Sequence, residues 1–230
     1  MTRLTGQERA RYVQTMFARI AGHYDLMNRL MTGGQDIRWR KQVIQLARLT
    51  PKSRLLDIGT GTGDLAREAL AQFPQAKVIA ADFTLEMMRI GQKKGVPNFS
   101  SADVLCLPFR DLSFDAVISG FLMRNLIDLQ KALREQYRVL KKGGRMVILD
   151  TTRPKKNILS PLIRLHMHAL IPVLGGLLAD AREAYRYLPE STERFVTAEE
   201  LASRIASVGF RKINYERLMF GTIAMHWGEK

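Results

Sequence analysis

The chain has 230 residues, of which 46% are hydrophobic and 25% charged, a composition typical of one α/β domain with additional segments rather than two full domains. Its single cysteine, Cys106, excludes an internal disulfide and a multi-cysteine metal site, so we expect no metal and a reducing, cytoplasmic location. The formal net charge of +14 indicates a polyanionic neighbour, either a nucleic acid or an anionic membrane surface.

Much of the positive charge lies in residues 1–54. They contain eleven Lys and Arg residues and three acidic residues, which gives +8 of the +14. A basic face that is simply solvated is the alternative interpretation. No RNA-binding signature accompanies the charge, so we expect no nucleic-acid partner. Residues 1–21 lack the apolar core of a signal peptide, and we expect none.

The N-terminal quarter is predicted to be helical. Within residues 7–22, four apolar residues recur at helical spacing: Val13, Met16, Phe17 and Ile20. We expect this amphipathic helix to pack as a cap over the ligand-binding site of the main domain. A second helix is expected to run to about Leu49, with Ile37, Ile44 and Ala47 facing inward. We therefore predict a helical cap over residues 1–50 and the main domain over residues 51–230.

Residues 54–66, RLLDIGTGTGDLA, have the pattern of a buried strand, a tight turn and a helix. The apolar run ends in glycines at alternate positions, Gly59, Gly61 and Gly63, and a helical pattern begins near Asp64. Glycine suits such a turn because its backbone adopts angles that a Cβ resists. The free N–H groups at the start of the helix are then available to a ligand.

Two acidic residues indicate which ligand this turn binds. Asp57 lies two residues before the first glycine, and Asp82 ends the next apolar run. Asp57 would repel a pyrophosphate, and the G-x-G-x-G spacing differs from the dinucleotide fingerprint. S-adenosylmethionine fits, with Asp57 facing its cationic side and Asp82 accepting from both ribose hydroxyls. A turn that binds NAD, or binds nothing, is the alternative.

Alternating strand and helix patterns follow and predict a parallel sheet. Strands are expected at residues 77–81, 98–102, 114–119 and 145–150, and helices at 84–94 and 128–141. Asp103 closes the third of these runs, where it can hold an adenine amino group with Val104 against the ring. A local turn cap is the alternative for Asp103. The predicted cofactor-binding residues are Asp57, Gly59, Thr60, Gly61, Thr62, Gly63, Asp82, Phe83, Asp103, Val104 and Gly120.

The C-terminal part has a different pattern. Residues 158–178 are apolar and nearly long enough to span a bilayer, but the charges and prolines inside them argue against a span. We interpret residues 155–190 as an inserted lid or membrane-contacting surface; simple core packing fits equally well. A helix over 197–208 and two antiparallel strands near 211–220 and 222–228 are expected to complete a seven-stranded sheet.

Four blocks of the chain together resemble one family. They are MFARIAGHYDLMNRLMTGGQDIRWR (16–40), LLDIGTGTGD (55–64), GFLMRNLIDLQKALREQYRVLKKGGR (120–145) and YRYLPESTERF (185–195). With them, nearly the whole chain resembles the UbiE/MenG family of quinone-biosynthesis C-methyltransferases. The resemblance implies a Rossmann-like class I methyltransferase fold: a mostly parallel seven-stranded sheet with helices on both faces.

The same resemblance implies the activity. We expect transfer of a methyl group from S-adenosylmethionine to a ring carbon of a reduced polyprenyl quinone, demethylmenaquinol in particular. A polyprenyl benzoquinol or another small apolar acceptor is the alternative, and an RNA-binding protein or RNA methyltransferase is a more remote one. The lipid tail of a polyprenyl quinol implies peripheral contact with an anionic membrane, at its inner face. A homodimer is also considered.

Residue roles follow from the resemblance. Arg124 and Asn125 come just after the fourth strand, where open α/β sheets bind ligands. Arg124 is expected to stabilise a phenolate or orient a water, and Asn125 to orient a ring oxygen; an ion pair of Arg124 with Asp128 is the alternative. Tyr24, the third predicted catalytic residue, is expected to close the pocket. The predicted substrate-binding residues are His23, Leu122, Tyr185, Tyr187 and Ser191.

Alternative interpretations concern His23 and Leu122. For His23, a histidine that simply lies at the surface is the preferred interpretation. Leu122 stands where the family usually has a glycine, within Phe121-Leu122-Met123-Arg124-Asn125. A bulkier residue at the pocket wall is expected to affect which acceptor ring or side chain the enzyme accepts.

Overall fold

The computed structural model describes residues 6–153 and 182–230, with the side chains of residues 182–186 excepted. Seven strands form one sheet in the order β3-β2-β1-β4-β5-β7-β6. Their bounds are β1 (Arg54–Ile58), β2 (Lys77–Asp82), β3 (Phe99–Ser101), β4 (Phe114–Gly120), β5 (Leu140–Thr151), β6 (Arg211–Leu218) and β7 (Ile223–Glu229). Strands β1 to β5 pair in parallel, and β7 is antiparallel to both β5 and β6. The predicted fold class is confirmed.

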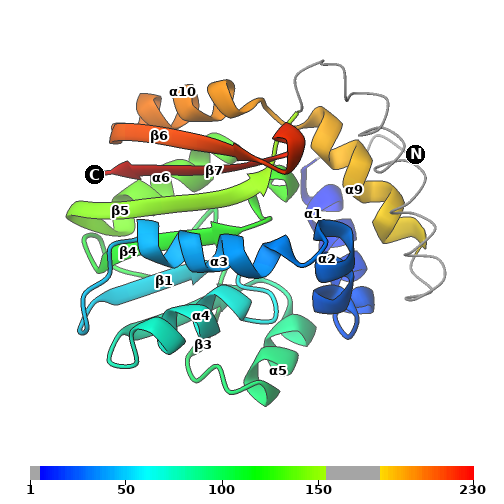
Figure 1. The fold of residues 1–230 in the computed structure, drawn as a ribbon, viewed down its shortest axis with the longest axis horizontal. Helices are drawn as coiled ribbons and strands as arrows, with labels where there is room; N and C mark the ends of the chain where they lie inside the picture. Colours follow the sequence, from blue (N-terminus) through cyan, green and yellow to red (C-terminus); the bar gives the residue numbers. More distant parts are fainter. Residues whose placement is uncertain (1–5, 154–181) are drawn as a thin grey trace.

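Helices cover both faces of the sheet (Figure 1). Their bounds are α1 (Gly6–Ile20), α2 (Tyr24–Thr32), α3 (Gln35–Leu46), α4 (Asp64–Gln72), α5 (Leu85–Lys93), α6 (Leu129–Val139), α9 (Arg182–Arg194) and α10 (Ala198–Val208). Successive residues of a strand point to opposite faces. Leu55 accordingly joins a core with α3 and α4, while Leu56 joins a second core with α6 and α10.

The N-terminal helices divide between two places. Helices α1 and α2 lie beyond one end of the sheet beside α9 (Figure 1), around a small apolar cluster that includes Met16, Ile20, Met27 and Met31. Helix α3 instead packs on the sheet through Trp39, Val43 and Ile44. Helices α3 and α4 therefore lie in the same layer, on one face of the sheet.

Two local predictions were wrong. The sequence pattern did not show α2, and it placed Ile37 inward, whereas Ile37 is 43% exposed. The inward position one residue earlier is taken by Asp36, which is fully buried and paired with Arg40 at 3.0 Å. A buried ion pair thus replaces the apolar residue that periodicity expects, and Ile37 is turned about 100° away.

Strand β5 also begins earlier than expected, at Leu140 rather than Arg145, because Leu140 pairs with Phe114 across an irregularity in the register. In the part of the chain that the structure describes, no helix is long and apolar enough to cross a membrane. Residues 158–178 lie outside it, as does most of the predicted lid.

Candidate active site

The loop Gly59–Gly63, which we call the glycine loop, joins β1 to α4 in a conformation that requires glycine. Gly59, Gly61 and Gly63 have φ values of 60°, 58° and 82°. A Cβ on Gly59 would lie 2.6 Å from Leu122 Cδ1, and a Cβ on Gly63 would lie 2.6 Å from Val96 Cγ2. Positive φ and close packing therefore both exclude larger side chains here.

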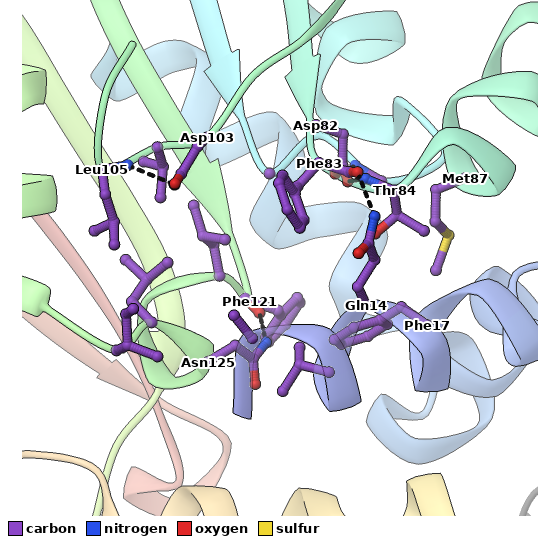
Figure 2. Close-up of a pocket in the computed structure, with 18 of the residues that line it drawn as sticks. Gln14, Phe17, Asp82, Phe83, Thr84, Met87, Asp103, Leu105, Phe121 and Asn125 are labelled. Carbon is purple, nitrogen blue, oxygen red and sulfur yellow. Dashed lines mark hydrogen bonds between the residues drawn. The ribbon is translucent and has the colours of Figure 1, made fainter. Parts of the chain in front are cut away.

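A cavity of about 590 Å³, the larger cavity, opens beside the glycine loop at the carboxyl ends of β1, β2 and β4. This is where open α/β sheets bind ligands, and the volume is within the range of small-molecule sites. Figure 2 shows two of its acidic residues, Asp82 and Asp103, across from Phe121 and Asn125. Its opposite wall is apolar and includes Val13, Phe17, Leu122, Leu126 and Ile127.

Asp82 is fixed in the wall of the larger cavity. Its Oδ2 accepts a 2.7 Å hydrogen bond from the Gly61 N–H, and its Oδ1 accepts one of 2.7 Å from the Thr84 N–H. Each carboxylate oxygen keeps a further lone pair for a ligand hydroxyl. Burial raises the pKa of Asp82. These features fit a ribose of S-adenosylmethionine.

Asp57, at the end of β1, is fully buried and incompletely bonded. Thr60 Oγ1 donates to its Oδ2 at 2.6 Å, while Oδ1 has no hydrogen-bond partner among the described residues. Burial, together with the charges of Asp82 and Asp64, raises the pKa of Asp57 to about 7. A buried acceptor without a hydrogen-bond partner costs free energy. A cationic donor group of a ligand would remove this cost, so Asp57 fits the cationic end of S-adenosylmethionine.

Four further predicted cofactor residues, Phe83, Asp103, Val104 and Gly120, line the larger cavity, on the side where an adenine is expected. Asp103 is exposed, and its Oδ1 accepts a 2.9 Å hydrogen bond from the Leu105 N–H, so it does form the turn cap considered as the alternative, while also lining the cavity. Val104 is buried in the wall, and the Phe83 ring stands 48% exposed at the cavity's edge. Gly120 contributes backbone at the end of β4.

Helix α1 contributes Val13, Gln14 and Phe17 to the lining of the larger cavity. Gln14 Nε2 donates to the Phe83 carbonyl at 3.0 Å and Arg9 Nη2 to the Arg124 carbonyl at 3.0 Å. These two bonds join α1 to the segments that follow β2 and β4, and Figure 2 shows Gln14 and Phe17 projecting from the helix. The amphipathic helix thus forms one wall of the site.

Tyr24 stands at the junction of the larger cavity and a second, smaller one and lines both. Its ring meets Phe17 edge-on, with centroids 5.8 Å apart. Burial raises the pKa of the Tyr24 phenol, while the nearby charge of Arg124 acts in the opposite direction. Tyr24 therefore stays protonated near neutral pH and can donate a hydrogen bond.

Arg124 is buried but does not line either cavity. Its Nη1 donates to Asp150 Oδ1 at 2.7 Å and to the Phe121 carbonyl at 3.0 Å. The alternative ion pair with Asp128 is wrong, because Asp128 caps α6 by accepting from the Lys131 N–H. The charge of Arg124 reaches Tyr24, and its side chain ties β4 to the end of β5.

Asn125 faces the larger cavity from the same turn. Its Nδ2 donates to the Phe121 carbonyl at 3.2 Å, and its buried Oδ1 has no hydrogen-bond partner within the described chain. Arg124 and Asn125 thus converge on the carbonyl of Phe121, whose φ of 59° is unusual for a bulky residue. The pair holds this strained turn at the rim of both cavities.

The remaining predicted residues lie around this centre. Thr60 and Thr62 line the smaller cavity, where Thr62 Oγ1 donates to Asp25 at 2.6 Å. His23 is exposed and does not line the larger cavity. Ser191 donates to the Leu188 carbonyl at 2.9 Å, and the Tyr187 ring lies 6.1 Å from that of Tyr12. Ser191 and Tyr187 line neither the larger nor the smaller cavity, and the side chain of Tyr185 is outside the described part.

Sequence reasoning missed two residues that shape the site. Gln14 was read only as part of a helix, and Asp150, the buried partner of Arg124, was not singled out. Asp150 is the second-to-last residue of β5, which pairs with β4. An acid at the carboxyl end of a neighbouring parallel strand is the signal that would have found it.

Comparison with known proteins identifies relatives of nearly full length. Residues 4–230 match the model of the ubiE/COQ5 methyltransferase family. A ubiquinone/menaquinone biosynthesis C-methyltransferase UbiE of Desulfotalea psychrophila is 44% identical over 222 residues, 95% of this chain and 90% of that protein. A demethylmenaquinone methyltransferase of Thermus thermophilus is 44% identical over 220 residues, 94% of this chain and all of that protein.

Solved structures share the fold at low identity. A Thermotoga maritima S-adenosylmethionine-dependent methyltransferase, described as a possible histamine N-methyltransferase, matches with a TM-score of 0.67 and 22% identity over 94% of this chain and 98% of that one. The [4+2]-cyclase SpnF matches with a TM-score of 0.70 and 17% identity, and the match covers 98% of this chain and 96% of that one. The fold thus hosts different chemistries, and the family match decides: the chain belongs to the ubiE/COQ5 methyltransferase family, whose methyl donor is S-adenosylmethionine.

Proposed function

We propose that this enzyme methylates a ring carbon of a reduced polyprenyl quinone and converts demethylmenaquinol to menaquinol. The observation that supports this most is the larger cavity, which runs from Asp82 beside the glycine loop to an apolar wall formed by α1 and residues 121–127. At Tyr24 it meets the smaller cavity, which Asp57 lines. The acids suit a cationic donor with a ribose, and the apolar wall suits an aromatic ring. The relatives named demethylmenaquinone methyltransferase support the same acceptor.

The chemistry assigns roles to the chain's own residues. Bound S-adenosylmethionine supplies an electrophilic methyl group. A ring carbon attacks it well only when a neighbouring hydroxyl has lost its proton, so the acceptor must be the quinol. Asn125 Oδ1, a buried acceptor without a partner in the described structure, is placed to hold a ring hydroxyl. Tyr24 can donate to the ring oxygen, and the charge of Arg124 favours the phenolate.

The first test measures transfer of labelled methyl from S-adenosylmethionine to short-tailed demethylmenaquinone, with and without dithionite. We expect label in the quinone only when dithionite is present, because the oxidised ring has no hydroxyl to ionise. A polyprenyl benzoquinol precursor and tRNA serve as alternative acceptors. Equal labelling without the reductant would contradict the quinol mechanism, and preferential labelling of another acceptor would overturn the substrate assignment.

Leu122 is proposed to limit the size of the acceptor. Its Cδ1 would lie 2.6 Å from a Cβ on Gly59, so the side chain fills space between the glycine loop and the larger cavity. Replacing Leu122 by Gly should shift the kcat/KM ratio toward a bicyclic over a monocyclic quinol by about tenfold, since a few methylenes in an apolar pocket are worth this much. Leu105→Ala, on the adenine side of the cavity, is the matched control and should leave the ratio unchanged.

Contact with an anionic membrane is a further part of the proposal. The edge of the larger cavity combines exposed apolar residues, Phe83 and Ile127, with the basic residues Arg11 and Lys131. Together with the net charge of +14, this favours an anionic lipid surface as the source of the substrate. The full-length protein should sediment with anionic vesicles at low salt and be released by high salt. Equal binding to neutral vesicles, or tighter binding to tRNA, would contradict the proposal.

A further inference from the structure

The smaller cavity, of about 40 Å³, lies next to the glycine loop and is lined by residues of α2, α3 and β1 and by Asp64 and Leu65 at the start of α4. Helix α2 contributes Tyr24 and Asn28, helix α3 contributes Arg40, and the end of β1 contributes Asp57. Gly59, Gly61 and Tyr24 line this cavity and the larger one alike. A ligand in the larger cavity can therefore extend one end past Tyr24 into the smaller one.

Apart from the Asp64 carboxylate, which is ion-paired with Arg40 and Arg67, two buried polar atoms in this cavity lack hydrogen-bond partners among the described residues. Asn28 is 8% exposed, and its Nδ2 donates to no acceptor in the described chain. Asp57 Oδ1 likewise accepts from no described donor. The Asn28 amide lies near enough to Tyr24 to lower the pKa of that phenol, but without the geometry of a hydrogen bond. Buried polar groups are normally bonded, so an unused donor and an unused acceptor in one cavity indicate a missing polar ligand.

The charges around the cavity indicate how such a ligand would be oriented. Arg40 is buried and faces Asp36 and Asp64, which offset its charge. The free donor is therefore the neutral Asn28 amide, assisted by the Arg40 field, and the free acceptor is Asp57. This arrangement complements a zwitterion whose carboxylate points toward α2 and whose ammonium points toward β1.

We infer that Asn28, supported by Arg40, binds the carboxylate of the amino-acid end of S-adenosylmethionine. The inference rests on the proposed function, because it requires that donor. It adds to the site a residue from helix α2, which also carries Tyr24. Helix α2 thus binds the carboxylate of S-adenosylmethionine through Asn28 and closes the pocket with the phenol of Tyr24.

The test compares two ligands that differ in this one group. Calorimetry measures the Kd of S-adenosylmethionine and of its decarboxylated analogue for the wild-type enzyme and for Asn28→Ala. We expect the variant to bind S-adenosylmethionine about 10-fold to 100-fold more weakly, the worth of a hydrogen bond to a charged group. Its affinity for the decarboxylated analogue should equal that of the wild type. Arg29→Gln, exposed on the same helix, should alter neither affinity.

Asn28→Asp keeps the shape of the side chain and guards against misfolding of the alanine variant, with melting temperature as the check. It should weaken binding of S-adenosylmethionine by repulsion and leave the analogue's affinity equal or higher. An equal loss for both ligands in either variant would overturn the inference, since Asn28 would then act only on the shape of the site. Failure of the wild type to bind S-adenosylmethionine at all would instead refute the proposed function.

Discussion

Replacing Arg124 by alanine is expected to lower the free energy of unfolding by about 3–5 kcal/mol, the cost of leaving one member of a buried ion pair alone. Asp150 is 1% exposed and accepts from the Arg124 side chain at 2.7 Å and the Arg124 N–H at 3.3 Å. Without the guanidinium, its charge would be buried with backbone N–H donors only. Chemical denaturation of the variant beside the wild type measures the loss.

A second variant separates stability from catalysis. In Arg124→Met combined with Asp150→Asn no buried charge is left unpaired, so at least half of the lost stability should return. Turnover should nevertheless stay about 100-fold below that of the wild type, because the strained turn at Phe121 has lost one of its two side-chain ties and Tyr24 has lost a neighbouring positive charge. The KM for the donor should change little.

The opposite outcome is equally informative. If the double variant regains both stability and full turnover, Arg124 acts only by stabilising the fold, and its proposed effect on the phenolate is refuted. Arg124→Lys keeps the charge but cannot reach Asp150 and the Phe121 carbonyl with the same planar group. It should therefore fall between the wild type and the double variant in turnover.

The donor side of the site could be predicted because its signals are local. Asp57, Gly59 and Gly61 lie within five residues, and their spacing alone indicates a strand, a turn and a ligand at the backbone. Asp82 is local in the same sense, since parallel strands place their carboxyl ends together. The structure adds that Asp82 accepts a hydrogen bond from the Gly61 N–H, so the acid at the end of β2 is bonded directly to the glycine loop.

The acceptor side could not be predicted because its contacts are between distant residues. The pairing of Arg124 with Asp150 spans 26 positions and depends on the register of β4 and β5. The nearer candidate, Asp128, fits helical spacing but is used to cap α6. Similarly, nothing in the periodicity of α1 shows that Gln14 reaches the Phe83 carbonyl, 69 positions away. Tertiary packing, which local patterns do not encode, decides these cases.

Asp57→Asn is expected to stabilise the fold while it damages the site. The pKa of Asp57 is about 7 in the folded chain, raised chiefly by burial, against a usual value of 3.8. A carboxyl with a raised folded pKa contributes its full stability below pH 3.8, and this is lost as pH rises through 7. The loss is at most about 4 kcal/mol. Above pH 7 the asparagine variant should thus melt at a higher temperature than the wild type, and near pH 4 the two should agree.

The same carboxyl makes donor binding depend on pH. A cationic ligand favours ionised Asp57, so below pH 7 binding must release a proton from this residue. Affinity for S-adenosylmethionine should therefore fall about tenfold between pH 8 and pH 6. Calorimetry in buffers of different ionisation enthalpy should count close to one proton released at pH 6.

Asp57→Asn should bind the donor about 10-fold to 100-fold more weakly at pH 8 and release no proton from this position. Asp82 also has a pKa raised by burial, so Asp82→Asn is the matched control, which should weaken binding but keep the proton release. If the proton release survives Asp57→Asn and disappears in Asp82→Asn, the cation lies nearer Asp82. The assignment of the two acids along the donor would then have to be reversed.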